Sequence, residues 1–411
     1  MPKNWKKYKL GDICDLRKDS ISPKKFNNEL YIGLEHIGQG TFLLEGIGNA
    51  SDVSSNKYRF LSGDILYGKI RPYFKKVYQP NFSGICSTDM LIFKTENEEI
   101  VNQSFLYHLI KTQEFTDRAT ETSSGTKMPR ADWNSLKQIE YKFPPLPEQK
   151  AIASILSALD DKIENNLAMN KTLEDMAMAL YNHWFVDFGP FQEGNFIDSE
   201  LGEIPEGWEV KRLDDISTVV DSLHKTPKYS EIGYPMVRVT NVKGGFLDLS
   251  KTLKVDKQVF QEFSKKHLPK TGDIIMTRVG TYGVCSLVST EDDFCLGQNT
   301  VVIISNFDSS YLFSALSSTK IKEQIEEQVT GSTQKTISLK SIRALKVVLP
   351  INLSNQILNQ FITQVSEFYL LGGKLNNENQ TLTQLRDTLL PKLISGEVRL
   401  KEFEEEITAA L

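Results

Sequence analysis

Long apolar runs are absent from this 411-residue sequence, and cysteine and histidine are scarce. No run approaches the ~20 apolar residues that cross a bilayer, and the N-terminus lacks the apolar core of a signal peptide. The four cysteines fit no metal spacing and are too sparse for a disulfide framework. They are Cys14, Cys86, Cys285 and Cys295. We therefore expect a soluble protein of a reducing cytoplasm, without a metal site.

Catalytic motifs are also missing. The five histidines are scattered, and neither a Walker loop nor a Gly-x-Ser-x-Gly motif occurs. Three short runs resemble parts of enzyme motifs: Glu148-Gln149-Lys150, Phe143-Pro144-Pro145-Leu146 and Gly38-Gln39-Gly40. The first opens a helix, where an acidic residue complements the dipole. The second has no leading Asn or Asp, and no helix follows the third. We expect no catalysis by this chain.

The charge is small overall and unevenly distributed. The net charge is −5, but residues 1–144 carry 21 Lys and Arg against 17 Asp and Glu. Residues 191–345 carry 18 against 21. The total charge argues weakly against a large non-specific grip on nucleic acid. It leaves room for local basic loops, or for a partner that supplies the electrostatics.

What the sequence does contain is a repeat with a spacing of about 205 residues. Its anchors recur in the same order in both halves, with offsets of 203 to 209. Trp5, Leu10, Asp12 and Ile13 match Trp208, Leu213, Asp215 and Ile216, and Gly63-Asp64-Ile65 matches Gly272-Asp273-Ile274. Such a repeat predicts two similar surfaces held by one chain.

Each copy consists of a globule followed by a long helix. The boundaries we expect are 1–146 and 191–352 for the globules, and 147–190 and 353–411 for the helical segments. In each globule, short strands bounded by Gly, Asn and Ser are interspersed with helices, among them 103–115 and 311–329. No regular βαβ rhythm occurs, which indicates the α+β class.

The helical segments have apolar residues at steps of four and three, typical of a coiled-coil seam. The first seam contains Ile152, Leu156, Leu159, Ile163, Asn170, Leu173, Leu180 and Trp184. The second contains Phe361, Val365, Phe368, Asn379, Leu382 and Leu389. The two asparagines either fix the register or mark a hydrated gap. Gly372-Gly373 marks either a kink or a place where the two helices approach each other closely. We expect the two seams to pair with each other.

Polar, basic loops are the best candidates for a binding surface. In the first copy they supply Lys24, Lys25, Lys69, Arg71, Tyr73, Lys75, Lys76, Lys127 and Arg130. In the second they supply His224, Lys225, Lys228, Arg278, Thr281, Tyr282 and Lys335. Such side chains can reach base edges and phosphates, and glycines beside them allow close approach. The alternative is an ordinary solvated hairpin whose lysines serve solubility.

Four stretches carry a family resemblance. They are residues 145–164, which begin Pro-Leu-Pro-Glu-Gln, and residues 179–188, 201–208 and 390–397. On these, the chain resembles the specificity (S) subunit of bacterial type I restriction–modification systems over essentially its whole length. The resemblance implies two target recognition domains, each reading half of a bipartite double-stranded DNA site. It also implies that two antiparallel helices set the spacer and dock two modification (methyltransferase) subunits.

The resemblance also implies where the chemistry lies. S-adenosylmethionine is expected on the modification subunits and ATP with Mg on restriction subunits that can join, with no cofactor in this chain. One departure is that the second copy has Pro350-Ile351-Asn352-Leu353 in place of the Pro-Leu-Pro-Glu-Gln run. The competing hypothesis is a coiled-coil scaffold whose two globules bind proteins.

Overall fold

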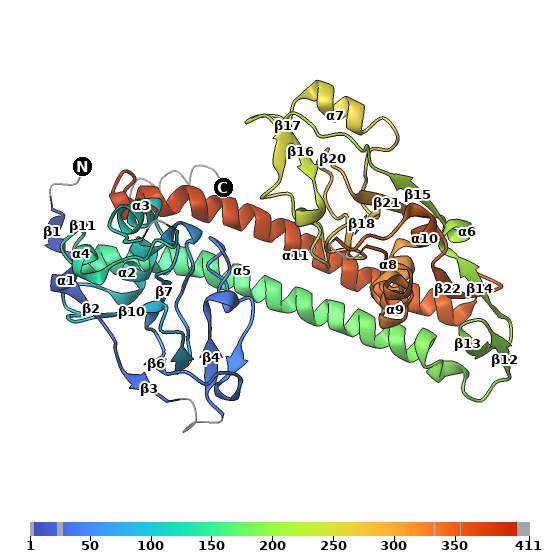
Figure 1. The fold of residues 1–411 in the computed structure, drawn as a ribbon, viewed down its shortest axis with the longest axis horizontal. Helices are drawn as coiled ribbons and strands as arrows, with labels where there is room; N and C mark the ends of the chain where they lie inside the picture. Colours follow the sequence, from blue (N-terminus) through green and yellow to red (C-terminus); the bar gives the residue numbers. More distant parts are fainter. Residues whose placement is uncertain (1–3, 23–27, 126, 332–333, 354, 401–411) are drawn as a thin grey trace. The chain divides into compact units, whose positions relative to one another are not determined.

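The computed structural model describes residues 4–22, 28–125, 127–331, 334–353 and 355–400 (Figure 1). The chain divides into two compact units. Unit 1 comprises residues 1–164 with 383–411, and unit 2 comprises residues 165–382. Each long helix therefore contributes one part to each unit. The first of these helices is α5 (Leu146–Tyr181) and the second is α11 (Gln356–Ser395).

In its described residues, unit 1 contains three small sheets and four short α-helices. A two-stranded sheet joins β1 (Lys6–Lys9) and β11 (Glu140–Phe143). A four-stranded sheet has the order β2 (Cys14–Leu16), β10 (Met90–Thr95), β7 (Ile65–Gly68), β8 (Val77–Tyr78). A five-stranded sheet has the order β3 (Ser20–Ile21), β6 (Lys57–Phe60), β9 (Gly84–Cys86), β4 (Leu30–Ile32), β5 (Gly48–Asn49). The helices are α1 (Leu10–Ile13), α2 (Gln103–Ile110), α3 (Gln113–Glu121) and α4 (Trp133–Leu136).

Unit 2 repeats this plan, with an added hairpin, an added helix and a smaller third sheet. The hairpin of β12 (Phe196–Ser199) and β13 (Gly202–Pro205) precedes a sheet of β14 (Trp208–Arg212) and β22 (Lys346–Pro350). The four-stranded sheet has the order β15 (Ser217–Asp221), β21 (Thr300–Ser305), β18 (Ile274–Thr277), β19 (Cys285–Leu287). A three-stranded sheet has the order β17 (Leu253–Val255), β16 (Tyr234–Val237), β20 (Cys295–Leu296). The helices are α6 (Leu213–Ile216), α7 (Lys257–Phe263), α8 (Ser309–Ser317), α9 (Thr319–Gln328) and α10 (Leu339–Arg343).

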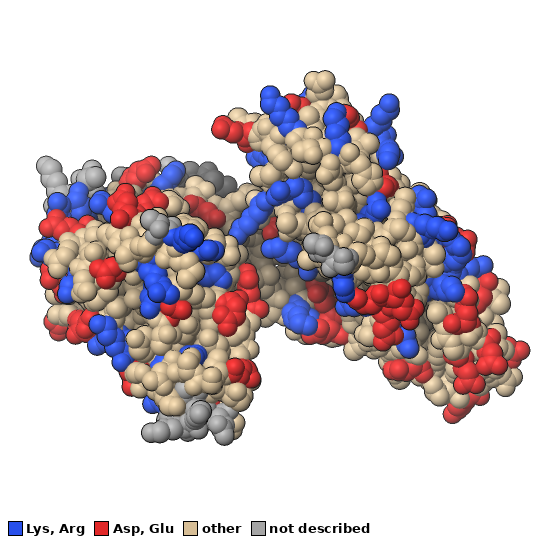
Figure 2. Space-filling view, viewed as in Figure 1, with Lys and Arg blue, Asp and Glu red and all other residues tan. Residues whose placement is uncertain are grey.

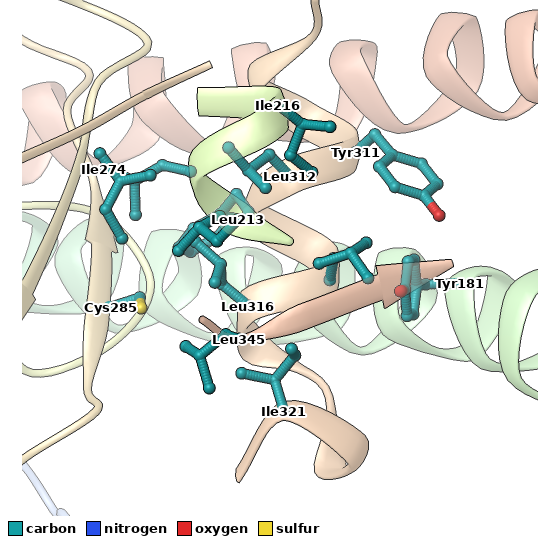
Figure 3. Packing of buried hydrophobic residues seen from close by; sticks show 14 of the residues in the cluster. Tyr181, Leu213, Ile216, Ile274, Cys285, Tyr311, Leu312, Leu316, Ile321 and Leu345 are labelled. Atoms are coloured by element: carbon teal, nitrogen blue, oxygen red, sulfur yellow. The ribbon is translucent and has the colours of Figure 1, made fainter. Parts of the chain in front are cut away.

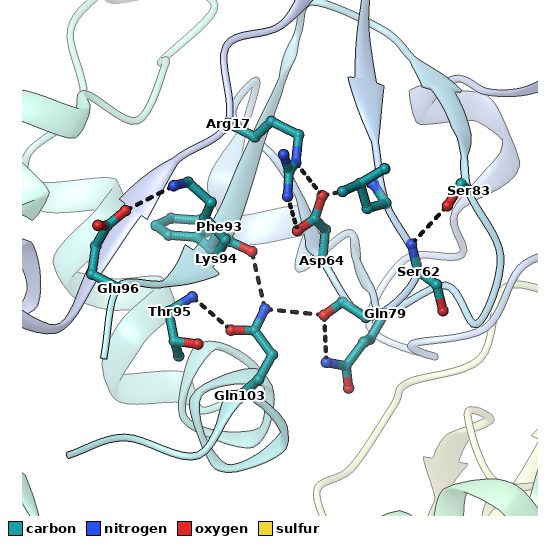
Figure 4. A network of polar contacts seen from close by, with 12 residues as sticks. Arg17, Ser62, Asp64, Gln79, Ser83, Phe93, Lys94, Thr95, Glu96 and Gln103 are labelled. Atoms are coloured by element: carbon teal, nitrogen blue, oxygen red, sulfur yellow. Dashed lines mark hydrogen bonds and ion pairs between the residues drawn. The ribbon is translucent and has the colours of Figure 1, made fainter. Parts of the chain in front are cut away.

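The repeat is visible in the strand order and in its turns. The order β2-β10-β7-β8 is matched by β15-β21-β18-β19, antiparallel throughout. Gly63 and Gly272 both have a left-handed φ, of 84° and 91°, which only glycine adopts without strain. In unit 1 that turn is fixed by Gln79 and Gln103, whose amides both donate to the Gly63 carbonyl (Figure 4). The α+β class and the two similar domains are thereby confirmed.

Two helices differ from the sequence-based expectation. The predicted single helix over 103–115 is two helices, α2 and α3, because Thr112 ends one and caps the other through the Phe115 amide at 3.2 Å. Likewise 311–329 is divided at Ser318, whose hydroxyl accepts from the Ile321 amide at 3.3 Å. A threonine or serine in the middle of a helical apolar pattern can cap a new helix, which divides the pattern into two helices.

The long helices run antiparallel within each unit and close both cores. In unit 1, Ile152 and Leu156 of α5 share a core with Leu389 and Leu393 of α11. In unit 2, Tyr181 of α5 lies 6.0 Å from the Phe361 ring, within the core of which Figure 3 shows part. The other proposed seam residues differ in exposure. Ile163, Val365, Asn170 and Asn379 are buried, and Leu159, Leu173, Leu180, Trp184, Phe368 and Leu382 are half-buried.

The buried asparagines make one direct pair. The Asn166 amide donates to the Asn379 side-chain oxygen at 2.9 Å and to Glu378 at 2.7 Å. Asn170 is buried too, but its side-chain oxygen has no hydrogen-bond partner among the described residues. A bonded polar pair in an apolar seam costs little, whereas a shifted register would bury it unpaired. The register of the helix pair in unit 2 is therefore fixed by Asn166 and Asn379.

The globule of unit 1 docks on the helices through buried charges. Lys111 forms an ion pair with Asp160 of α5, and Arg386 of α11 reaches the same carboxylate at 3.3 Å. Both cations lie over the Phe42 ring, at 4.6 and 5.1 Å from its centroid. Burial lowers the pKa of Lys111 to about 8, despite the ion pair. Asp160 and the Phe42 ring thus hold two cations where the globule meets both helices, and Asp387 pairs with Arg386 as well, at 2.9 Å.

The globule of unit 2 docks at the equivalent place through neutral contacts. The hydroxyl groups of Tyr369 and Ser314 are 2.8 Å apart. A Cβ added at Gly372 would lie 2.5 Å from the Phe246 ring, and one at Gly373 would lie 2.8 Å from the Ser289 Cβ. The glycine pair therefore marks a close approach of globule to helix, and α11 continues unbroken through it.

This packing predicts the effect of Gly373→Ala. The substitution favours the helix by about 1 kcal/mol, but overpacking against Ser289 costs about 1–3 kcal/mol. The Asn377 side-chain amide also donates to the Ser289 carbonyl at 2.8 Å, so the backbone at Ser289 has little freedom to move away from α11. We expect a net loss of about 1 kcal/mol in urea unfolding.

The double variant Gly373→Ala/Ser289→Gly, which removes the opposing Cβ, should recover most of the loss. Thr381→Ala on the exposed side of α11 serves as the control. A single Gly373→Ala variant more stable than the parent would contradict the close-approach interpretation.

Candidate nucleic-acid interface

In unit 1 the two basic loops predicted from the sequence lie side by side. The Arg71 amide donates to the Pro129 carbonyl at 2.8 Å, and the Ala131 amide donates to the Lys69 carbonyl at 2.8 Å. The loop after β7, residues 68–76, is thereby joined to the loop after α3, residues 123–130. We call this pair reading loops 1.

Reading loops 1 contain an unusual backbone. Arg71 and Lys75 both have a left-handed φ, of 52° and 49°, on either side of the single turn Pro72–Phe74. Residues other than glycine in this region cost about 1–3 kcal/mol each, and such strain concentrates at functional sites. At the tip, Tyr73 is 50% exposed and Met128 of the neighbouring loop is 49% exposed. The strained turn therefore holds the Tyr73 ring out in solvent, and the Met128 thioether is exposed as well.

The cations of reading loops 1 are not equally available. Lys127 is exposed, and the Arg71 guanidinium lies 5.8 Å from the Phe74 centroid. Lys69 and Arg130 lie 3.8 and 3.9 Å from the Asp89 carboxylate. Lys75 donates to Gln113 at 3.1 Å, and burial lowers its pKa. Lys76 donates to the carbonyls of Leu34 and Ile37, so its amine is engaged within the fold. Lys24 and Lys25 lie outside the described residues.

Unit 2 has the same arrangement with different side chains. The Gly280 amide donates to the Lys335 carbonyl at 3.1 Å, and the Ile337 amide donates to the Arg278 carbonyl at 3.0 Å. Residues 277–283 and 330–337 therefore form reading loops 2. Gly280 takes the left-handed position that Arg71 holds in unit 1, with φ 76°. The first copy thus keeps an arginine where glycine fits without strain.

Tyr282 links the parts of reading loops 2. Its hydroxyl donates to Glu326 at 2.7 Å and accepts from the Lys335 amine at 3.2 Å. The hydrogen bond with Tyr282 is the main reason why the pKa of Lys335 is raised and that of Glu326 is lowered. Thr281 beside it is exposed. The result is an exposed, hydrogen-bonded cation on an aromatic ring.

Asp221 gathers further basic residues of unit 2. Its carboxylate accepts from Arg278 at 2.8 Å and lies 3.0 Å from the His224 ring nitrogen. Its carbonyl accepts from Lys266 at 3.3 Å. Arg278 has only 13% of its side chain exposed, so it supports the loops more than it projects from them. Lys225 pairs with Glu262 at 2.7 Å, and Lys228 is exposed.

The two organising carboxylates were not anticipated from the sequence. Asp89 and Asp221 each lie beside two of the predicted basic residues. Asp89 is far in sequence from both Lys69 and Arg130, whereas Asp221 is far from Arg278 but only three residues from His224. The repeat offered a partial signal for Asp89, since it precedes β10 as Asn299 precedes β21, and both carbonyls bind the loop amide after β7 or β18. For Asp221 the local signal was its position three residues before His224, and nothing local linked it to Arg278.

The arrangement suits binding. The loops present hydrogen-bond donors, cations and aromatic faces, as groups that contact bases and phosphates do. All four cysteines are buried, and burial raises the pKa of Cys285 and Cys295 to about 12. Within the described ranges, no group of three His, Cys, Asp or Glu could hold a metal ion. In the same ranges, no helix is both long and apolar enough to cross a membrane.

Comparison with known proteins identifies the family. The model of the type I restriction modification DNA specificity domain matches residues 2–175 and again residues 205–378. The chain therefore belongs to this family, with one domain in each copy of the repeat. It is a DNA specificity subunit of a type I restriction–modification system with two target recognition domains, and is itself non-catalytic.

Individual relatives agree with this assignment. The MjaIX specificity subunit of Methanocaldococcus jannaschii is 30% identical over 313 residues, 74% of this chain and 71% of that protein. The HindI specificity subunit of Haemophilus influenzae is 25% identical, covering 96% of this chain and all of that protein. The crystal structure of an S subunit from M. genitalium superposes with a TM-score of 0.57 over 95% of this chain and 96% of that one, at 18% identity.

Proposed function

We propose that each recognition domain reads one half of a bipartite DNA site through its reading loops. The observation that carries this proposal is the identical pairing of two loops in both units, with different side chains on the same backbone frame. The shared backbone arrangement would place both pairs of loops against DNA in the same way. The side chains differ, because Arg71 and Tyr73 in unit 1 can make other contacts than Thr281 and Tyr282 in unit 2. Base edges in the major groove discriminate between such donors and acceptors.

The helices supply spacing and assembly. α5 has 36 residues and α11 has 40, or about 54 and 60 Å of helix at 1.5 Å per residue. In unit 2 they expose apolar side chains that the fold does not use. These are Leu167, Met169, Met176, Leu370 and Leu371, 42–62% exposed. Exposed apolar patches favour a protein partner. We infer that two modification subunits dock on the helix pair.

The chemistry belongs to the partners. The modification subunits supply S-adenosylmethionine for adenine methylation, and restriction subunits that use ATP and Mg can join the assembly. The place of action is the cytoplasm, where the DNA is. This chain determines which sequence is recognised and how far apart its two halves lie.

The central experiment maps methylated adenines genome-wide in cells with and without this gene, with a methyltransferase of the same genome present. We expect methylation at one split sequence to vanish without the gene, and the purified methyltransferase to co-elute with the full chain. Unchanged methylation together with no co-elution would refute the proposed function.

Substitutions in the reading loops should act on one half-site each. We expect Arg71→Ala to relax or weaken recognition of one half-site, by about 1–3 kcal/mol if a base contact is lost. Arg278→Ala should affect only the other half-site, because its loss frees Asp221 and loosens reading loops 2. Methylation of a library randomised in both half-sites measures this.

Arg118→Ala, an exposed change on α3 of unit 1, is the matched control and should leave both half-sites unaltered. Equal losses at both half-sites for Arg71→Ala would mean that Arg71 acts through overall folding.

The spacing role is tested by lengthening both helices. One heptad is inserted into α5 after Glu164 and one into α11 after Leu382, at the boundary between the units. A heptad keeps the seam in phase and adds about 10 Å, or about three base pairs at 3.4 Å each. We expect the preferred spacer to lengthen accordingly in a library of spacer lengths.

Insertion into one helix alone puts the seam out of register, and is expected to lower methylation at every spacer. If the complex with both insertions methylates only sites with the original spacer, the helices do not set the distance between the half-sites.

A further inference from the structure

The positive charge of unit 2 is concentrated in one segment. Residues 222–273, between β15 and β18, carry ten Lys and Arg against five Asp and Glu. The remainder of residues 191–345 carries eight against sixteen. The equivalent segment of unit 1, residues 17–64 between β2 and β7, carries six of each sign. We call residues 222–273 the basic lobe.

The basic lobe has its own small core, which turns its lysines outward. On α7, Phe260 and Phe263 are buried, and the Phe260 ring stacks on Tyr234 with centroids 4.0 Å apart. The Asp256 carboxylate caps the helix by accepting from the Val259 amide at 2.8 Å. With one face of α7 fixed inward, Lys257 and the lysines after the helix are left exposed.

Most of these cations have no partner within the lobe. Lys225 pairs with Glu262 and Lys266 donates to the Asp221 carbonyl. Among the residues that the structure describes, six further lysines of the lobe are exposed and form no ion pair with a carboxylate of the fold. They are Lys228, Lys243, Lys254, Lys257, Lys265 and Lys270. Figure 2 shows Lys and Arg side chains over the part of unit 2 that carries α7 and β17.

Arg238 adds a guanidinium that is incompletely bonded. It lies 5.9 Å from the Tyr229 ring, and its buried Nε has no hydrogen-bond partner in the described chain. The lobe is also tied to reading loops 2, because Asp221 holds His224 and Lys266 of the lobe together with Arg278. Unbalanced charge therefore lies beside the surface proposed to read bases.

We propose that the basic lobe is a sequence-independent clamp on the phosphate backbone of DNA, present in the second recognition domain and without a counterpart in the first. Phosphates are the charge-complementary ligand, and a clamp tied to Asp221 would contact those next to the second half-site. The inference rests on the proposed DNA reading, but it assigns different residues and a different property: affinity without base preference.

Salt dependence of binding tests the clamp without knowledge of the recognised sequence. Each phosphate contact that is lost lowers the slope of log Kd against log salt concentration by about 0.9. For the full chain on a 30-base-pair duplex of mixed sequence, Lys257→Gln/Lys265→Gln should lower the slope by about 1.8. Lys257→Arg/Lys265→Arg, which keeps the charge, should retain the parent slope.

The matched control is Lys320→Gln/Lys322→Gln, two exposed lysines of α9 outside the basic lobe. This control should keep the slope of the parent. An unchanged slope for Lys257→Gln/Lys265→Gln, or an equal fall in the control, would overturn the clamp.

The clamp and the reading function fail separately. A chain that has lost the clamp still directs methylation of the same split sequence by the modification subunits at low salt, with weaker binding as salt rises. Conversely, if the salt dependence of binding is as predicted but no split sequence is methylated, the reading function is refuted and the clamp is not. Urea unfolding of both glutamine variants confirms that the fold is retained.

Discussion

In each unit the recognition domain and the two helix segments depend on the interface between them, because neither part buries its apolar surface alone. Several buried seam positions are polar: Asn166, Asn170 and Asn379 in unit 2 and Arg386 in unit 1. Each globule in turn needs side chains from both helices to complete its core. Helical stability in proteins comes mostly from such tertiary packing. The position of the reading loops is therefore fixed by the same contacts that hold the helices together.

This interface uses different chemistry in the two copies. In unit 1, Asp160 and Phe42 hold two buried cations, and removing one partner of such a cluster leaves an uncompensated charge. In unit 2, the close approach at Gly372 and Gly373 requires only small residues and shape. The two copies thus share the position of the contact between globule and helices, but not the type of interaction that makes it.

The sequence predicted the repeated domains and the long helices, but not how the basic loops pair or where the charge of unit 2 is concentrated. Repeated anchors such as Gly63 and Gly272 mark backbone conformations that few residues adopt, so they can be read without coordinates. Two-residue strands such as β3 and β5 have no periodicity to detect, and the caps at Thr112 and Ser318 lay inside an apolar helical pattern. The pairing of the reading loops depends on contacts between residues about 60 apart, which no local pattern reports. The basic lobe was hidden because its charge was averaged with an acidic neighbourhood over residues 191–345.

The discontinuity of unit 1 has a consequence for the order of events during synthesis. Its core contains Leu389, Leu390, Leu393 and Ile394, which are translated after all of unit 2. Domains generally fold as units while the chain emerges from the ribosome. Unit 2 is contiguous and has every residue of its core once position 382 has been made. The globule that begins the chain is therefore the one that finishes last, and it waits with an open apolar face until the final turns of α11 arrive.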